Sequence, residues 1–148
     1  MIATPDRDML AGRLTGEGHE LTQRVYFEDT DFSGRVYHAR YLHFMERGRS
    51  DYLRHLGIHH RELAKDGLAF AVRRMEIEFL KPASIDDILM IRTQTRDVGG
   101  ARVHLHQEIS RGEGLLVAAE VVVALVGPGG RPMRLPPSIR AALGAAPE

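Results

Sequence analysis

The chain contains a single long stretch with helical periodicity, and almost everything after it has the pattern of β-strands. From His38 to Leu56, apolar side chains recur every three or four residues and form one stripe, made of Tyr41, Phe44, Met45, Gly48, Tyr52 and Leu56. Such a stripe predicts a helix that buries one face. One helix cannot cover both faces of a multi-stranded sheet. Either the sheet curls around the helix, or its uncovered face meets another subunit.

Gly48 lies inside this apolar stripe. A glycine in a helix costs about 1 kcal/mol of helix propensity relative to alanine. We therefore expect the helix to approach a sheet or another helix closely at this residue.

Five strands are expected, one before the helix and four after it. Alternating or continuously apolar patterns place them at residues 21–27, 70–79, 88–97, 103–109 and 115–126. In the second of these, Phe70 and Val72 have the opposite parity to Met75, which predicts a bulge near Arg73. Two shorter helices are expected at residues 59–65 and 136–145. Residues 1–19 show no sustained period, so the predicted organisation is a loose lead-in (1–20), one domain (21–135) and a helical tail (136–148).

Composition excludes several classes of protein. The 148 residues suffice for one domain, and 20 basic residues balance 20 acidic ones, so no overall field attracts nucleic acid or an anionic membrane. The absence of cysteine excludes a disulfide scaffold and a thiol nucleophile. The longest apolar run, Leu115 to Val126, is too short for a transmembrane segment and contains Glu120. Without a recognisable secretory signal, we expect a cytoplasmic protein.

The densest polar cluster, residues 28–34 (EDTDFSG), comes immediately before the long helix. A helix start has unpaired N–H groups and the positive end of the helix dipole, which can stabilise a developing oxyanion. A nearby aspartate can act as a base or nucleophile. The same residue types also cap helices without any catalytic role, and the pattern by itself leaves both interpretations open.

Other site types are less well supported. A calcium-binding loop starting at Asp29 would place Arg40 where a bidentate glutamate is required. His104 and His106 share a face of one strand but lack an obvious third ligand, so no metal is expected. Several basic residues lie near turns, namely Lys81, Arg96, Arg102, Arg131 and Arg134. They are either candidates for binding a phosphate or ordinary solvated charges.

The segment VYFEDTDFSGRVYHARY (residues 25–41), with FMERGR (44–49) behind it, closely resembles the hotdog-fold acyl-CoA thioesterases of the 4-hydroxybenzoyl-CoA thioesterase type. It is most similar to the Tol–Pal-associated branch, whose motif reads approximately E-D-T-D-x-x-G-x-V-Y-H-x-x-Y. The resemblance continues through residues 79–83 and 86–89 and covers about residues 21–126.

This resemblance implies an α+β hotdog fold, in which an antiparallel sheet wraps around the long helix. It also implies a homodimer or homotetramer with the site at the subunit interface. Asp31 matches the family's catalytic carboxylate, and His38 matches the residue whose backbone N–H polarises the thioester carbonyl. The resemblance also implies that Gly34, Val36, Tyr37 and Tyr41 contact the substrate. Lys81 and Arg102 are added to this substrate-binding set because of their charge and their position near turns.

The implied function is hydrolysis of an acyl-CoA to the free acid and CoA, with no metal or other cofactor. Acyl carrier protein is a further expected partner. Two alternatives stay open: a non-catalytic acyl-CoA or acyl-carrier-protein binding module of an envelope-associated system, and a hotdog hydratase.

Overall fold

A computed structural model describes residues 12–145 of the chain. Its six-stranded antiparallel sheet has the order β1-β2-β4-β5-β6-β3. The strands are β1 (Arg13–Thr15), β2 (Gly18–Arg24), β3 (Ala69–Phe79), β4 (Ile88–Val98), β5 (Arg102–Arg111) and β6 (Gly114–Val126). The helices are α1 (Arg40–His55), α2 (His60–Lys65) and α3 (Pro137–Ala145), with single 3₁₀ turns at Phe27–Asp29 and Pro128–Gly130.

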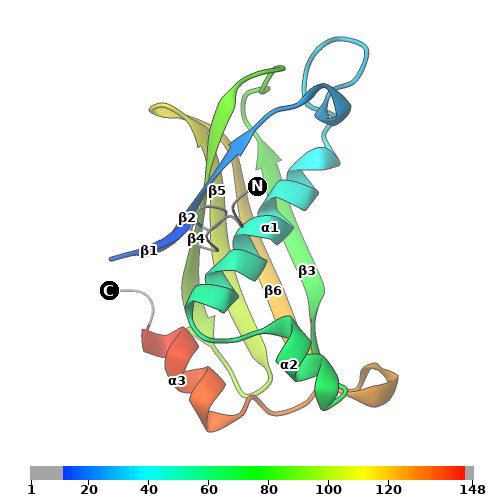
Figure 1. Cartoon of the computed structure of the whole chain (residues 1–148), viewed down its shortest axis with the longest axis vertical. Coiled ribbons are helices and arrows are strands. Elements are labelled where there is room, and N and C mark those ends of the chain that lie inside the picture. Colours follow the sequence, from blue (N-terminus) through cyan, green and yellow to red (C-terminus); the bar gives the residue numbers. More distant parts are fainter. Residues whose placement is uncertain (1–11, 146–148) are drawn as a thin grey trace, which may run out of the picture.

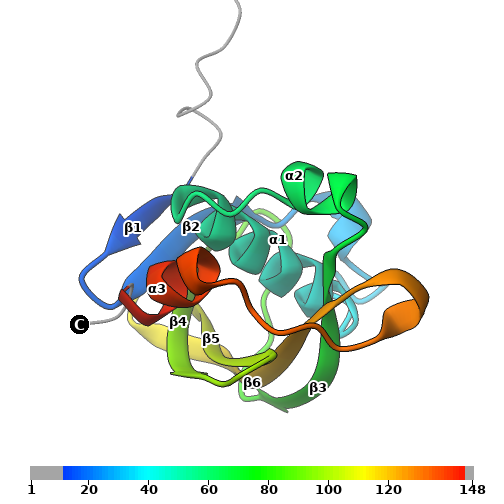
Figure 2. The same cartoon turned by 90° about the horizontal axis from the view of Figure 1, so that it is seen from below.

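The sheet curves around α1, as expected for a hotdog fold (Figure 1). Viewed from below, α1, α2 and α3 all lie on the concave side of the sheet, and the opposite face carries no helix (Figure 2). None of the helices in residues 12–145 has the length and apolar character needed to cross a membrane.

The predicted apolar stripe is the buried face of α1. Tyr41, Phe44, Met45 and Tyr52 are at most 3% exposed. Gly48 is also buried, and a Cβ atom there would lie 2.8 Å from Ile91 Cγ2 of β4. The expected close approach at Gly48 is therefore confirmed, because only a residue without a side chain lets α1 lie so near the sheet.

A polar group also lies at this contact. The buried side chain of Gln107 on β5 donates to the Met45 carbonyl and to Thr93 Oγ1, each at 2.9 Å. Its amide oxygen accepts a hydrogen bond from Arg49 Nη1 at 3.0 Å. Both the nitrogen and the oxygen of this amide have hydrogen-bond partners. The buried Gln107 side chain therefore links α1 to the sheet without the usual penalty for burying an amide.

The strand predictions hold for the four later strands, and the predicted bulge in β3 is confirmed as a register shift between Val72 and Arg74. The expectation of a loose lead-in was wrong for residues 13–19. They form β1 and the start of β2, and β2 pairs with β4 from His19 to Arg24. The first predicted strand is therefore shifted toward the N-terminus, because pairing with β4 outweighs the weak local pattern of GHELTQR. The rest of the predicted lead-in, residues 1–11, lies outside the described part of the chain.

The helix-free face of the sheet carries a network of charges. His104 Nε2 lies 2.7 Å from Glu120 Oε1, and His106 contacts both Glu120 and Glu108. Burial opposes the charged form of His106, but the Glu108 and Glu120 carboxylates outweigh it and raise the pKa of this histidine. These two histidines, which the sequence placed on one face, are thus paired with carboxylates.

Candidate active site

The two aspartates of the EDTD motif have different surroundings. Asp29 is 2% exposed, and its carboxylate accepts hydrogen bonds from the Tyr26 backbone N–H at 2.8 Å and from Arg40 Nε at 2.7 Å. Asp31 is exposed. Asp29 therefore ties the loop to the first turn of α1, whereas Asp31 is available to a ligand.

The Asp31 carboxylate is ionised at neutral pH. Its Oδ1 accepts hydrogen bonds from both the hydroxyl and the backbone N–H of Ser33, the latter at 2.8 Å. These two bonds lower the pKa of Asp31, and the positive charge of Arg35 acts in the same direction. Among residues 12–145, no hydrogen bond reaches its other oxygen, Oδ2.

A tight turn holds Asp31 in place. The Asp31 N–H donates to the Arg35 carbonyl at 2.9 Å, and the Gly34 N–H donates to the Asp31 carbonyl at 3.0 Å. Gly34 has a φ of 82°, a left-handed conformation that favours glycine. A bridge between Thr30 and Val36 closes the turn, so that Asp31 lies next to the chain entering α1.

The start of α1 has no side-chain cap. The helix begins at Arg40, two residues later than predicted, and its N-cap is Ala39. The Tyr37 N–H donates to the Asp29 carbonyl at 3.0 Å, whereas the His38 N–H donates to no acceptor among the described residues. The capping role considered for this polar cluster is therefore absent at α1, and an unpaired N–H stands at the positive end of the helix.

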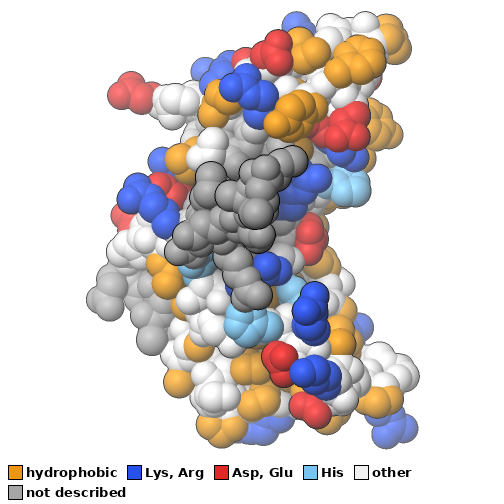
Figure 3. Space-filling view, in the orientation of Figure 1, with side chains coloured by type: hydrophobic (Ala, Val, Ile, Leu, Met, Phe, Trp, Pro, Cys, Tyr) orange, Lys and Arg blue, Asp and Glu red, His pale blue; other side chains and the backbone are white. Residues whose placement is uncertain are grey.

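Exposed apolar side chains surround this turn. The His38 ring lies 4.7 Å from the Tyr37 ring and 6.2 Å from Phe79, measured between centroids. Hydrophobic side chains gather at this end of the molecule, where α1 begins (Figure 3). We call these exposed residues the aromatic rim. It consists of five aromatic residues, Tyr26, Phe27, Phe32, Tyr37 and Phe79, and of three aliphatic ones, Leu80, Ile85 and Ile88. Phe27 and Phe32 are 81% and 106% exposed, which is unusual for large apolar residues and typical of a binding surface.

A family model, the thioesterase-like superfamily, matches residues 25–143. The chain belongs to this superfamily. It is 42% identical over 131 residues to the acyl-CoA thioesterase YbgC of Haemophilus influenzae, a match that spans 87% of this chain and 96% of the relative. It is also 43% identical over 118 residues to the acyl-CoA thioester hydrolase YbgC of Escherichia coli, spanning 78% and 88%. The crystal structure of a probable thioesterase from Bartonella henselae has a TM-score of 0.78 at 50% identity, and the match covers 80% of this chain and 99% of that one.

The other residues predicted to bind substrate differ in how deeply they are buried. Val36 and Tyr41 are buried, and the Tyr41 hydroxyl accepts a hydrogen bond from the Ala83 N–H at 3.0 Å. Burial raises the pKa of Tyr41, so this phenol stays neutral. Both residues support the wall behind the turn, because Val36 also bonds to Ala83 through its N–H at 2.9 Å. Tyr37 is exposed in the aromatic rim.

Lys81 and Arg102, both proposed to bind substrate, lie at different ends of the sheet. Lys81 is exposed and comes two residues before Ala83, on which the Asp31 turn docks. Arg102 follows the β4–β5 hairpin and pairs with Ala124 near the end of β6, at the opposite end of the sheet from α1's first turn (Figure 1). Within one chain, Lys81 therefore lies near the residue that contacts the Asp31 turn, whereas Arg102 lies at the far end of the sheet.

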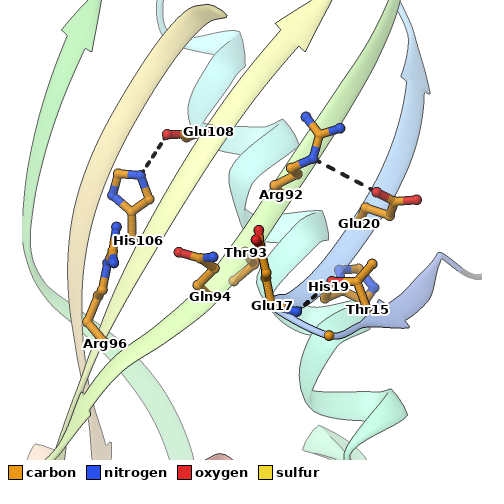
Figure 4. A pocket seen from close by; sticks show the side chains of 11 residues that line it. Thr15, Glu17, His19, Glu20, Arg92, Thr93, Gln94, Arg96, His106 and Glu108 are labelled. Carbon is orange, nitrogen blue, oxygen red and sulfur yellow. Dashed lines mark hydrogen bonds and ion pairs between the residues drawn. The ribbon is translucent and has the colours of Figure 1, made fainter. Parts of the chain in front are cut away.

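A polar hollow of about 470 Å³ lies on the helix-free face, between the β1–β2 turn and strands β4 and β5. In this hollow Arg92 points toward Glu20, with 3.9 Å between Nε and Oε2, and His106 points toward Glu108 (Figure 4). Arg96, one of the cations considered for phosphate binding, also lines it. None of the residues that line this hollow lies at the start of a helix, so the Asp31 turn is the better candidate for the active site.

Three features of this site could not be predicted from the sequence. These are the Asp29–Arg40 pair, the support of Asp31 by Ser33, and the clustering of exposed aromatic residues. Of the two aspartates in E-D-T-D, the resemblance selects Asp31, and the burial of Asp29 in the structure is consistent with that choice.

Proposed function

We propose that this protein hydrolyses acyl-CoA thioesters to the free acid and CoA, using Asp31 and the His38 backbone N–H. The observation that carries this proposal is that the segment leading into α1 contains both an exposed, ionised carboxylate, that of Asp31, and an N–H without an acceptor among the described residues, that of His38. The names of the relatives described above, which are acyl-CoA thioesterases, support the same reaction.

The chemistry suits these groups. Sulfur gives a thioester carbonyl little resonance stabilisation, so an N–H donor at the positive end of a helix polarises it effectively. The Asp31 carboxylate either activates a water, whose oxygen bonds to the acyl carbon, or attacks that carbon itself and forms an anhydride that water then hydrolyses. In both routes the C–S bond breaks and CoA leaves as a thiolate, which needs little protonation. None of these steps calls for a metal or another cofactor.

A second copy of the chain completes this site in our proposal. Two observations favour it: the aromatic rim leaves large apolar surface exposed, and β3 is an eleven-residue edge strand with one side unpaired within residues 12–145. Long open edges are normally covered or paired. Antiparallel pairing of β3 with its copy would continue the sheet across two subunits, and two such pairs could form a tetramer.

This pairing would also supply an apolar pocket. A cavity of about 120 Å³ lies between α1 and the sheet, next to the first residues of β3. It is lined mainly by Leu53, Phe70, Val72, Val103, Leu105, Val123 and Leu143. Phe79, at the other end of β3, contacts His38. In an antiparallel pair the two ends of β3 lie side by side, so the Asp31 turn of one subunit would face the apolar cavity of the other.

The central test compares the two aspartates of the motif. We expect Asp31→Asn to lower kcat for acyl-CoA hydrolysis by about 100- to 10,000-fold, because the general base or nucleophile is lost. Binding of a non-hydrolysable acyl-CoA analogue should be retained. A panel from short aliphatic through long-chain to aromatic acyl-CoA, followed by release of free thiol, measures both turnover and acyl preference.

Asp29→Asn is the matched control. It removes a carboxylate of the same motif, but this carboxylate pairs with Arg40, so we expect destabilisation by about 1–3 kcal/mol and a much smaller fall in turnover. Thermal unfolding gives the first quantity. If Asp31→Asn hydrolyses the panel as fast as the wild type, the proposed mechanism is wrong. If the wild type hydrolyses no member but binds the analogue, a binding module is the correct function.

Acyl carrier protein as a partner and a cytoplasmic location remain predictions of this proposal. Acyl-carrier-protein thioesters, assayed beside CoA thioesters with the same acyl group, distinguish the two carriers. Fractionation of cells that express the native chain tests the location.

A further inference from the structure

A second cluster of chemically active side chains lies away from the Asp31 turn, between β2 and the last turns of α1. His19 Nε2 on β2 is 2.7 Å from Asp51 Oδ2 on α1, and His55 Nε2, one helical turn later, is 3.3 Å from the same oxygen. One ligand atom from each residue lies within 4.8 Å of the other two. We call these three residues the His–Asp–His cluster.

Burial makes this cluster unusual. The His19 side chain is 0% exposed, and those of Asp51 and His55 are 15% and 27% exposed. Polar groups in such places normally have hydrogen-bond partners. Among the described residues, His19 Nδ1 and His55 Nε2 have none. The cluster thus holds a buried imidazole that points to a carboxylate, together with a second imidazole whose nitrogen is left without a hydrogen bond.

The carboxylate is also held in position. Asp51 Oδ2 accepts a hydrogen bond from the Gly12 N–H at 2.7 Å. The i, i+4 spacing of Asp51 and His55 places both side chains on one side of α1.

We propose that His19, Asp51 and His55 bind one divalent transition-metal ion, with Zn²⁺ as the representative ion. Two imidazoles and one carboxylate form a donor set that suits zinc and its neighbours and leaves a further coordination position to water. Small side-chain rotations would bring the three ligand atoms to a common centre. Bonds to the ion would then replace the present contacts of His19 and His55 with Asp51 Oδ2. The ion would link the N-terminal strand β2 to the C-terminal half of α1.

This site is separate from the proposed active site. Asp51 and His55 belong to the last turns of α1, whereas the His38 N–H precedes the first turn of this sixteen-residue helix. The expected consequence of metal binding is therefore a gain in stability rather than a change in chemistry.

The experiment uses the full chain after removal of metals with a chelator. Titration with Co²⁺ followed by visible absorption, and equilibrium dialysis with Zn²⁺ followed by elemental analysis, should show about one ion per chain. Zn²⁺ should raise the Tm of the wild type. His55→Gln, at a partly exposed position, and Asp51→Asn should each weaken metal binding by more than about 100-fold and abolish the rise in Tm.

His43→Gln and His106→Gln are the controls, since His43 is an exposed histidine of α1 and His106 belongs to the helix-free face. Both should bind Co²⁺ and Zn²⁺ as the wild type does. Hydrolysis of acyl-CoA by His55→Gln should also be unchanged, which separates this proposal from the proposed function. The proposal is overturned if the wild type binds neither ion, or if His55→Gln binds them as tightly as the wild type. Either result would make the cluster a hydrogen-bonded group only.

Discussion

At the scale of single residues, the site depends on a difference between two aspartates that are two positions apart. Asp29 is enclosed and paired with a cation, so its removal affects the fold. Asp31 is exposed and accepts hydrogen bonds from its own turn, and in our proposal its removal affects the chemical step. The motif resemblance points to Asp31, but it does not show that Asp29 is enclosed, because burial depends on how the chain around the motif packs.

Ser33 sets the protonation of Asp31 in this structure. Its two hydrogen bonds are the main cause of the lowered pKa. We therefore expect Ser33→Ala to raise the pKa of Asp31 toward that of an ordinary aspartate. NMR titration of the labelled Asp31 carboxyl group measures this change directly.

The pH dependence of activity should follow. The ionised form of Asp31 is present above its pKa and is lost as the pH falls through it, so the acid limb of kcat/KM should move to higher pH in Ser33→Ala. Ser138→Ala, in α3, provides a control that should leave the acid limb in place. An unchanged carboxyl titration in Ser33→Ala would contradict the role given to Ser33.

At the scale of elements, the contact between α1 and the sheet fixes the position of the helix that follows the Asp31 turn. Gly48 lets the helix approach β4 and β5, and Gln107 bonds to the helix backbone one turn earlier, at Met45. Helical periodicity predicted this buried stripe correctly. The strand pattern could not predict β1 and the early start of β2, because these segments form by pairing with β4 rather than by their own propensity.

Gly48→Ala tests the close approach of α1. A Cβ atom at residue 48 would lie 2.8 Å from Ile91 Cγ2 and 3.2 Å from Thr93 Oγ1, so the overpacking should outweigh the gain in helix propensity. We expect a net destabilisation of about 1–2 kcal/mol in chemical denaturation. Gly144→Ala in α3 is the control, because no atom of the described residues lies within 4 Å of its added Cβ atom. It should be neutral or slightly stabilising, and equal effects of the two substitutions would argue against tight packing at Gly48.

At the scale of the whole molecule, one subunit contains only part of the proposed site. The Asp31 turn and the apolar cavity lie at opposite ends of β3, and only pairing of this strand with a copy would bring them together. In our proposal, contact with the second copy also accounts for the exposed aromatic rim. The fold thus provides the two halves of a site in a geometry that a two-fold axis can join.

Mixed dimers test this shared site. Val72→Arg places a cation at the mouth of the apolar cavity, and we expect it to be inactive alone, as Asp31→Asn is. Dimers of one Asp31→Asn chain and one Val72→Arg chain, purified through two different tags, should recover about half of the wild-type activity, because one of the two sites is intact. The crossed control pairs a wild-type chain with a chain that carries both substitutions. It should be inactive if sites are shared and half-active if each site lies within one chain.

The sequence by itself determined the central helix, four of the strands, the bulge in β3 and the family, because periodicity and a long motif are local properties that can be read along the chain. The tertiary structure decided which aspartate of the motif is exposed, that Arg102 lies apart from Asp31, and that His19 meets Asp51 and His55. These outcomes depend on contacts between residues distant in sequence. His19 shows the reason most clearly, since it belongs to a segment without a pattern of its own and becomes a buried partner of α1 only when β2 pairs with β4.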